Sequence, residues 1–321
     1  MNALMSLPSV AVVIPTRNRL DSLRQCLGRL MPYVSTHPEC QLIVSDDGQA
    51  SQTRDALTGE FGIVQVVQGP GRGPAANRNC GAAHSTRDIV VFLDDDCTPD
   101  PNLIAAYQNA AINNPDVGVF EGRISPEGTI SSFADAAPSN ETGGYLWSCN
   151  FAIRRELFTH LGGFDERFPF AAVEDVDFHL RVKRQSPVLF VPDARVWHQV
   201  ERKLGWKIVQ HHTLSVLLFL HIHGLESTNK NPTFFLRMAI KSLLFTGIRH
   251  LRAGTAKHPS YLLSRVWVNL QLSLMILFWK SHAAMAKQFY PPCCSGCKSI
   301  HAVLASPSQA WLLLQERPSI P

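Results

Sequence analysis

Three consecutive carboxylates follow an apolar run in the stretch DIVVFLDDDCTPD, which spans residues 88–100. Like charges this close repel one another, and removing them from water is unfavourable unless a cation or hydrogen bonds compensate. Carboxylate oxygens suit Mg²⁺ and Mn²⁺, which proteins usually hold with one or two carboxylates and substrate phosphates. The alternative is that these residues cap the helix expected next, but a cap needs only one aspartate, so three in a row favour a metal. Asp94, Asp95 and Asp96 therefore predict a divalent cation shared with a phosphate-bearing substrate.

Two further polar groups are placed where they could meet such a substrate. Arg78 lies in GRGPAANRNCG, where glycines and a proline begin a helix whose first N–H groups favour anions. We expect it to reach a phosphate or carboxylate, or else to remain a solvated surface arginine. Asp46 and Asp47, in SDDG, either form an Asx turn or contact a ribose or base.

An acid pair and a histidine further along the chain are also candidates for the site. Glu174 and Asp175 open a predicted helix, where they form a favourable acidic first turn or supply a general base facing the substrate. His198 ends the apolar stretch VWH, as an ordinary core or surface residue or, in its neutral form, as a further metal ligand.

The elements that position these residues alternate in type. Through the first 120 residues, short Val- and Ile-rich runs alternate with amphipathic runs of helical length, which predicts βαβ units and a mostly parallel sheet. Continuous apolar strands indicate a sheet covered on both faces. Ligands of such sheets bind beyond the carboxyl ends of the strands, where Thr16, Asp46 and Asp94 fall.

The region that follows is less regular. Residues 122–144 are rich in Ser, Gly and Pro and predict a mobile loop over the site. A strand and a helix return in LWSCNFAIRRELFTHLGG, and PVLFVPDARVWH predicts two short final strands. After His198 the pattern changes to long apolar runs with interspersed basic residues, so we place a domain boundary at residue 200.

Charge separates the two parts of the 321-residue chain. Residues 1–200 carry 16 Lys and Arg against 23 Asp and Glu, whereas residues 201–321 carry 14 against 3. The apolar helix predicted at residues 261–280 bears a polar stripe. Its uninterrupted apolar stretch is therefore too short to span a bilayer. The basic region is therefore either a helical subdomain packed on the first domain or a peripheral contact with an anionic membrane. No dense basic run alternates with aromatic residues, so we expect no nucleic-acid partner.

The distribution of the cysteines and the first residues of the sequence indicate the cellular compartment in which the protein resides. Eight cysteines scattered over the chain do not form a disulfide framework, and the first residues lack the basic region of a secretory signal. We therefore expect a cytoplasmic protein, peripheral at the inner face of the cell membrane. Cys293, Cys294 and Cys297 are either half of a zinc site, together with His301, or free or lipid-modified thiols.

Several stretches, taken in order, resemble one enzyme family. They are VVIPTRNR, IVSDDG, GRGPAANRNCGA, VVFLDDDC, CNFAIRRELFTHLGGFDERF, EDVDFHLR and VWH. Over roughly residues 9–198 the chain is similar to the inverting family 2 glycosyltransferases of GT-A fold, a Rossmann-like α/β fold with a mixed, mostly parallel sheet. The basic residues 201–321 would be a C-terminal helical extension.

The resemblance implies roles for the residues singled out above. Thr16, Asp47 and Arg78 would contact the nucleotide. Asp94 and Asp96 would be the ends of the DXD motif, with Asp95 between them, at the ribose, diphosphate and metal, and His198 would lie beside the metal. Asp175 would be the catalytic base and Glu174 would contact the acceptor. The chain departs from the family at Val173, where glycine is frequent, and at Gln49, where Ser or Thr is frequent.

The function expected from this resemblance is transfer of a sugar from a nucleotide-diphosphate donor to a hydroxyl acceptor with Mg²⁺ or Mn²⁺. The acceptor would be a glycan or a lipid-linked molecule, in cell-surface polysaccharide or glycolipid biosynthesis. Two alternatives stay open: a non-catalytic nucleotide-sugar or glycan-binding protein of the same fold, and a nucleotidyltransferase, which would release pyrophosphate.

Overall fold

The computed structural model describes residues 7–168, 170–202, 232–257 and 259–277, and the short stretches 211–212, 215–216, 218–219 and 222–223. The tail cysteines considered for zinc lie outside the described residues. The described chain divides into two compact units. The first comprises residues up to Thr129 and Ala137–Glu201, and the second comprises Ile130–Ala136 and the residues from Arg202 onward.

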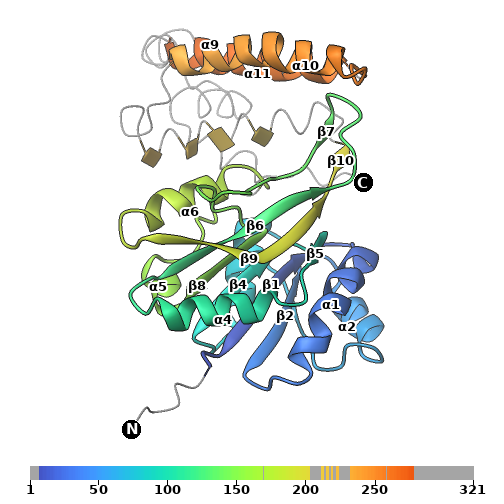
Figure 1. Ribbon diagram of the computed structural model, residues 1–321, viewed down its shortest axis with the longest axis vertical. Helices are drawn as coiled ribbons and strands as arrows, with labels where there is room; N and C mark the ends of the chain where they lie inside the picture. Colours follow the sequence, from blue (N-terminus) through green and yellow to red (C-terminus); the bar gives the residue numbers. More distant parts are fainter. Residues whose placement is uncertain are drawn as a thin grey trace, which may run out of the picture. The chain divides into compact units, whose positions relative to one another are not determined.

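The first unit is an α/β domain (Figure 1). Its strands are β1 (Val10–Thr16), β2 (Cys40–Asp46), β3 (Gln65–Gln68), β4 (Ile89–Leu93), β5 (Cys97–Pro99), β6 (Val119–Glu127), β8 (Asn150–Arg154) and β9 (Val188–Gln199). Its helices are α1 (Leu20–Val34), α2 (Ala50–Leu57), α3 (Pro74–Ala83), α4 (Leu103–Asn113), α5 (Arg155–His160) and α6 (Glu174–Val182).

These strands form one sheet in the order β3-β2-β1-β4-β8-β6-β9-β5. The pairs β3–β2, β2–β1 and β1–β4 are parallel, whereas β8 runs antiparallel to both β4 and β6. Strand β9 is parallel to β6 and antiparallel to β5. The expected mixed, mostly parallel α/β sheet is therefore confirmed.

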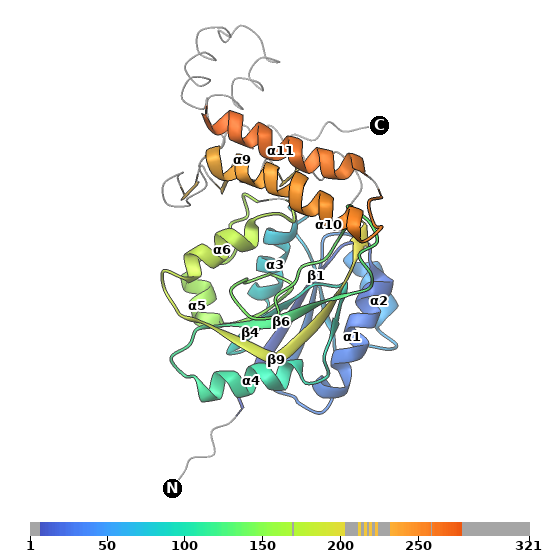
Figure 2. The same ribbon diagram turned by 45° about the horizontal axis from the view of Figure 1, so that its top comes forward.

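Alternate residues of the central strands bury against helices on opposite faces of the sheet. Val10, Val12 and Ile14 pack with α1, α2 and α4, while Ala11 and Val13 pack with α3, α5 and α6 (Figure 2). All five side chains are fully buried, which is why β1 reads as a continuous apolar run. Because β1, β2 and β4 run parallel to one another, their carboxyl ends meet at one edge of the sheet, and the polar residues that follow them gather there.

Two expectations about the second half of this unit are wrong. The stretch PVLFVPDARVWH forms one strand, β9, instead of two. Its pairing with β6 shifts register between Gly122 and Arg123, so residues 192–194 bulge out while the strand continues. The predicted loop at residues 122–144 likewise begins as strand, because β6 continues to Glu127 alongside β9.

The described part of the second unit is mainly helical. It contains α9 (Pro232–Lys241), the π-helical turn η1 (Ser242–Thr246), α10 (Gly247–Arg252) and α11 (Pro259–Leu277), with a small sheet of β7 (Asp135–Ala136) and β10 (Glu201–Arg202). Asp135 accepts a hydrogen bond from Arg202 at 2.9 Å. Among the described residues, no helix has the length and apolarity of a transmembrane helix. The assignment of residues 201–321 as a separate domain stays a prediction.

Candidate functional site

In the acidic turn between β4 and β5, each of the three carboxylates has a different nearest partner. Asp94 accepts a hydrogen bond from Arg78 at 2.7 Å, and Asp96 accepts one from Arg19 at 2.6 Å. Asp95 turns inward and accepts a 2.6 Å hydrogen bond from the hydroxyl of Thr16. Cations and a hydroxyl thus compensate the repulsion that the sequence implied.

Asp95 anchors this turn to the end of β1. Its side chain is buried, and burial raises its pKa to about 6, while the Thr16 hydrogen bond and the Arg19 charge oppose that rise. Thr16 is also buried, so its hydroxyl is committed to Asp95. The nucleotide contacts expected for Thr16 and Asp95 stay predictions, and the geometry supports a role in positioning the neighbouring aspartates.

Asp94, Asp96 and His198 come together at the end of the turn. Their ligand atoms all lie within 4.8 Å of one another. Pairing of β5 with β9 sets Cys97 opposite His198, which places the histidine beside the acidic turn although a hundred residues separate the two strands in sequence. The structure therefore gathers the three residues predicted as metal ligands, although their ligation of a metal stays a prediction.

The polar atoms of this cluster fit a hard divalent cation. His198 Nδ1 lies 3.0 Å from the carbonyl oxygen of Gln199, which can only accept, so Nδ1 carries a hydrogen and the neutral ring has its lone pair on Nε2. Nε2 lies 3.3 Å from Asp96 Oδ1. That buried oxygen has no hydrogen-bond partner among the described residues. Two carboxylates and an imidazole lone pair suit Mn²⁺ or Mg²⁺.

Arg78 links the acidic turn to the start of α6. It is buried on α3, and its guanidinium donates to Asp94 at 2.7 Å and to Glu174 at 3.2 Å. Burial acts to lower the pKa of Arg78, but the charges of Asp94 and Glu174 outweigh it and raise the pKa above its usual value. The group therefore stays charged. Its predicted nucleotide contact stays a prediction, because in this structure the guanidinium bridges two carboxylates.

Glu174 and Asp175 differ in exposure although they are neighbours. Glu174 is buried, and its Oε2 has no hydrogen-bond partner among the described residues. Asp175 is partly exposed, and its Oδ1 accepts a 2.7 Å hydrogen bond from the backbone N–H of Val176. Burial raises the pKa of both carboxyl groups, and the charge of Asp175 raises that of Glu174 further, whereas Arg78 lowers both. Asp175 is thus the member of the pair that solvent can reach.

The acid pair is preceded by a strained backbone. Val173, the N-cap residue of α6, has φ 72° and ψ −10°, in the left-handed region. A β-branched residue is an outlier there, since the left-handed conformation costs about 1–2 kcal/mol for residues with a Cβ. Glycine, which is frequent at this position in the resembling family, adopts this conformation without that cost. The chain therefore holds Glu174 and Asp175 on a strained turn.

Asp47 organises the loop that leads into α3. Its carboxylate accepts hydrogen bonds from the backbone N–H groups of Gly71 at 2.9 Å and Gly73 at 3.3 Å. Gly73 has φ 100°, which favours glycine, and Pro74 then begins the helix. A Cβ on Gly69 would collide with Asp47 and Asn77, so the loop packs closely on β2. The nucleotide contact expected for Asp47 stays a prediction.

Arg19 was not singled out from the sequence. Its side chain is about half exposed, and Nη1 lies 2.6 Å from Asp96 and 3.3 Å from Asp95. It is therefore a cation on the open side of the acidic turn. The sequence held a signal for it, because TRNR places basic residues directly after β1, at the edge where ligands of parallel sheets bind.

Comparisons with known proteins find similarity to glycosyltransferases. Residues 11–162 match the sequence model of glycosyl transferase family 2. A probable glycosyltransferase, YdaM, of Bacillus subtilis is 26% identical over 227 residues, covering 63% of this chain and 53% of that protein. The pre-mycofactocin glycosyltransferase of Mycobacterium tuberculosis is 30% identical over 227 residues, covering 61% and 43%. The chain thus spans about half the length of these curated relatives.

Solved structures show the same fold. GalNAc-T7 with UDP, GalNAc and Mn²⁺ superimposes with a TM-score of 0.55 at 15% identity, covering 89% of this chain and 59% of that one. The mannosyltransferase PcManGT of Pyrobaculum calidifontis, in complex with GDP-Man and Mn²⁺, gives a TM-score of 0.50 at 17% identity, covering 96% and 86%. The GT-A fold expected from the sequence is therefore confirmed.

Proposed function

We propose, on the premise that residues 11–162 form a glycosyl transferase family 2 domain, that the protein is a metal-dependent inverting glycosyltransferase. It would move a sugar from a nucleotide-diphosphate donor to a hydroxyl acceptor. The observation that carries this proposal is the convergence of Asp94, Asp96 and His198 within 4.8 Å at the carboxyl edge of the sheet.

The donor would bind on the side of the acidic turn. A Mg²⁺ or Mn²⁺ ion bound there would be held by Asp94, Asp96 and His198, and would stabilise the negative charge that develops on the leaving nucleoside diphosphate. Arg19 would pair with diphosphate oxygens, because its guanidinium is half exposed and already lies against Asp96. Asp47 would shape the nucleotide side of the site through the Gly71–Gly73 backbone.

The acceptor would bind on the side of α6, with Asp175 as general base. Its carboxylate is partly exposed, and its raised pKa makes it a stronger base than an ordinary aspartate while Arg78 opposes full neutralisation. It would take the proton of the acceptor hydroxyl as that oxygen attacks the anomeric carbon from the face opposite the leaving group, which inverts the configuration. Glu174 was expected to contact the acceptor, but it is buried against Arg78, so we assign it to holding the arginine in place.

The acceptor class is proposed from relatives and from the second unit. A Haloferax volcanii relative, 23% identical over 60% of this chain, is named glucosyl-dolichyl phosphate glucuronosyltransferase, and a Myxococcus xanthus relative is named O-antigen biosynthesis protein RfbC. We propose a glycan or lipid-linked acceptor in cell-surface polysaccharide or glycolipid assembly, used at the cytoplasmic face of the cell membrane. Exposed apolar residues on α9, η1, α10 and α11 support a peripheral membrane contact.

The proposal is tested by screening purified protein with nucleotide-diphosphate sugars and Mn²⁺. Ligands should raise the unfolding temperature only when Mn²⁺ is present, because they bind the native state. The stabilising donor should then be hydrolysed slowly to a nucleoside diphosphate. With a nucleoside triphosphate and a sugar 1-phosphate in place of the donor, release of pyrophosphate would indicate a nucleotidyltransferase. Binding of donor sugars without any turnover would indicate a non-catalytic binding protein.

A further inference from the structure

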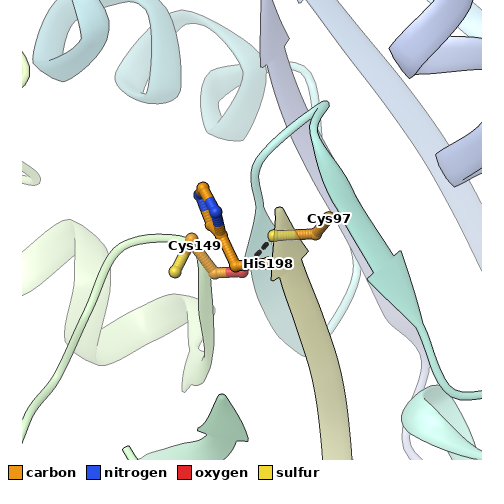
Figure 3. Close-up of side chains that lie close together, drawn as sticks. All are labelled: Cys97, Cys149 and His198. Atoms are coloured by element: carbon orange, nitrogen blue, oxygen red, sulfur yellow. Dashed lines mark hydrogen bonds between the residues drawn. The ribbon is translucent and has the colours of Figure 1, made fainter. Parts of the chain in front are cut away.

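A second cluster of metal-ligating atoms lies beside the acidic turn (Figure 3). It consists of the thiols of Cys97 and Cys149 and the imidazole of His198, whose ligand atoms lie within 4.8 Å of one another. All three residues are buried. From this cluster we infer that the protein has a site for a thiophilic divalent cation such as Zn²⁺, and that this site and the Asp94–Asp96 cluster compete for His198.

Two strands and the residue before a third build the cluster. Cys97 on β5 and His198 on β9 are direct partners in an antiparallel pair, so their side chains point to the same face of the sheet. Cys149 directly precedes β8, and its carbonyl oxygen lies 3.8 Å from the thiol of Cys97 (Figure 3). Because the sheet fixes all three backbones, the donor atoms are brought together without help from the ion.

The distances are close to those that zinc needs. Zn²⁺ lies about 2.3 Å from sulfur and about 2.0–2.1 Å from nitrogen, so the ligands of a tetrahedral site are about 3.5–3.8 Å apart. The three donor atoms lie within 4.8 Å of one another, so each pair needs to approach by at most about 1.0–1.3 Å to reach that spacing.

The protonation states also suit this site. Both thiols are buried, and each would bind Zn²⁺ as a thiolate after losing its proton. Binding of Zn²⁺ would therefore release two protons, one from each thiol, and leave two thiolate ligands. In the neutral ring of His198 the Gln199 carbonyl holds the hydrogen on Nδ1, so Nε2 is the nitrogen that would bind a metal.

The two sites would exclude each other through one nitrogen atom. Nε2 of His198 lies 3.3 Å from Asp96 Oδ1, so an ion held with the carboxylates and an ion held with the thiolates both need the same lone pair. Soft thiolates favour Zn²⁺ over Mn²⁺, whereas carboxylates suit Mn²⁺. Zn²⁺ would thus displace Mn²⁺ by removing His198. This competition rests on the proposed function, whereas the thiolate site itself does not.

Cd²⁺ is the probe for the thiolate site, because Cd–thiolate bonds give an ultraviolet charge-transfer band. The full chain would carry serine at Cys293, Cys294 and Cys297, so that the tail cannot bind the ion. This protein should bind one Cd²⁺ with the thiolate band, and Cys97→Ser and Cys149→Ser should each weaken binding more than about 100-fold. Cys80→Ser, on α3 and outside the cluster, should leave binding unchanged. Equal Cd²⁺ affinity in all four proteins, or no band in the first, would overturn the inference.

Two further measurements separate the site from its consequence. X-ray absorption of the zinc-loaded protein should show two sulfur neighbours at about 2.3 Å, a result that requires no variant to fold. One equivalent of Cd²⁺ should also release protein-bound Mn²⁺, seen as an increase in the free-ion electron paramagnetic resonance signal, and should not do so in Cys97→Ser. A thiolate band without any bound Mn²⁺ would contradict the proposed function and leave the thiolate site standing. An oxygen-only zinc environment would contradict the site.

Discussion

At the scale of single residues, a buried arginine connects the two sides of the proposed site. Arg78 donates to Asp94 at 2.7 Å and to Glu174 at 3.2 Å, and both its own side chain and that of Glu174 are only 4% exposed. Removing one partner of a buried ion pair leaves the other charge without compensation in a poorly solvating interior. Burial raises the pKa of Glu174, and the charge of the arginine opposes that rise.

Replacing Arg78 should destabilise the protein through Glu174. Arg78→Met should lower the free energy of unfolding by about 3–5 kcal/mol, because it leaves the Glu174 carboxylate buried and unpaired. Adding Glu174→Gln should recover part of that loss, since the amide carries no charge. Urea unfolding of the two single variants and the double variant measures the coupling, and strictly additive losses would show that the pair does not interact.

Asp175 is the residue on which the chemistry depends. Asp175→Asn should reduce sugar transfer by at least about 10²-fold while leaving Mn²⁺-dependent donor binding intact, because the amide cannot accept the acceptor proton. Asp193→Asn, an exposed position on β9, is the matched control and should transfer at the normal rate. Retention of transfer in Asp175→Asn would assign the base elsewhere, and loss of donor binding would move Asp175 to the donor side.

The pH profile gives a second test of the same base. The pKa of Asp175 is raised, mainly by burial, and the ionised form is the active one. The rate of transfer should therefore be at its maximum above this raised pKa and should fall as the pH decreases through it. The fall should occur at a higher pH than it would for an aspartate with an ordinary pKa. Measuring kcat against pH should show this acidic limb in the wild type. A rate that stays constant down to the usual aspartate range would contradict the assignment.

At the scale of elements, the sequence predicts what depends on local pattern and misses what depends on pairing. The strands β1, β2 and β4 could be predicted from their continuous apolar runs, because both of their faces are buried. The position of the carboxylates near their ends could be predicted because ligands bind beyond the carboxyl ends of parallel strands. That β9 is one strand and not two depends on a register shift in its pairing with β6, which cannot be predicted from the local sequence pattern. The contacts of Arg19 with the acidic turn, and the approach of Cys149 to Cys97, likewise join residues far apart in the chain.

The strained start of α6 gives a prediction at this scale. Val173→Gly should raise the free energy of unfolding by up to about 1 kcal/mol, because relief of the left-handed conformation outweighs the entropy that glycine adds to the unfolded chain. Val176→Gly, three residues later on the exposed face of the same helix, should instead lower it by about 1 kcal/mol. Denaturant unfolding distinguishes the two. Equal destabilisation by both would show that Val173 carries no strain.

At the scale of the whole molecule, basic charge is concentrated in the second part of the chain, and exposed large apolar residues gather on its described helices. Residues 201–321 carry 14 basic and 3 acidic residues. The exposed large apolar residues on the described helices of this part are Leu236, Ile240, Leu243, Leu244, Ile248, Leu251, Leu263 and Trp267. Exposed basic residues lie on the same helices at Arg237, Lys241, Arg249, Arg252 and Arg265. Apolar and basic groups together are typical of helices that lie in a membrane interface.

Vesicle sedimentation tests this surface. The full chain should sediment with vesicles that contain anionic lipid and should detach as salt rises, because the attraction of basic groups to the bilayer is screened. Leu251→Ser combined with Trp267→Ser should weaken binding, whereas Ile63→Ser, an exposed apolar position in the first unit, should not. Equal binding to neutral vesicles would reject the electrostatic part, and no effect of the double variant would reject the apolar part.

The measurement that tests the central claim most directly is calorimetric titration of nucleoside diphosphates into the protein with and without Mn²⁺. The account predicts that wild type binds one of them only with Mn²⁺, and that Asp96→Ala abolishes this binding while unfolding cooperatively like wild type. Asp116→Ala, an exposed aspartate in the loop after α4, should bind like wild type. Unchanged Mn²⁺-dependent affinity in folded Asp96→Ala would contradict the account.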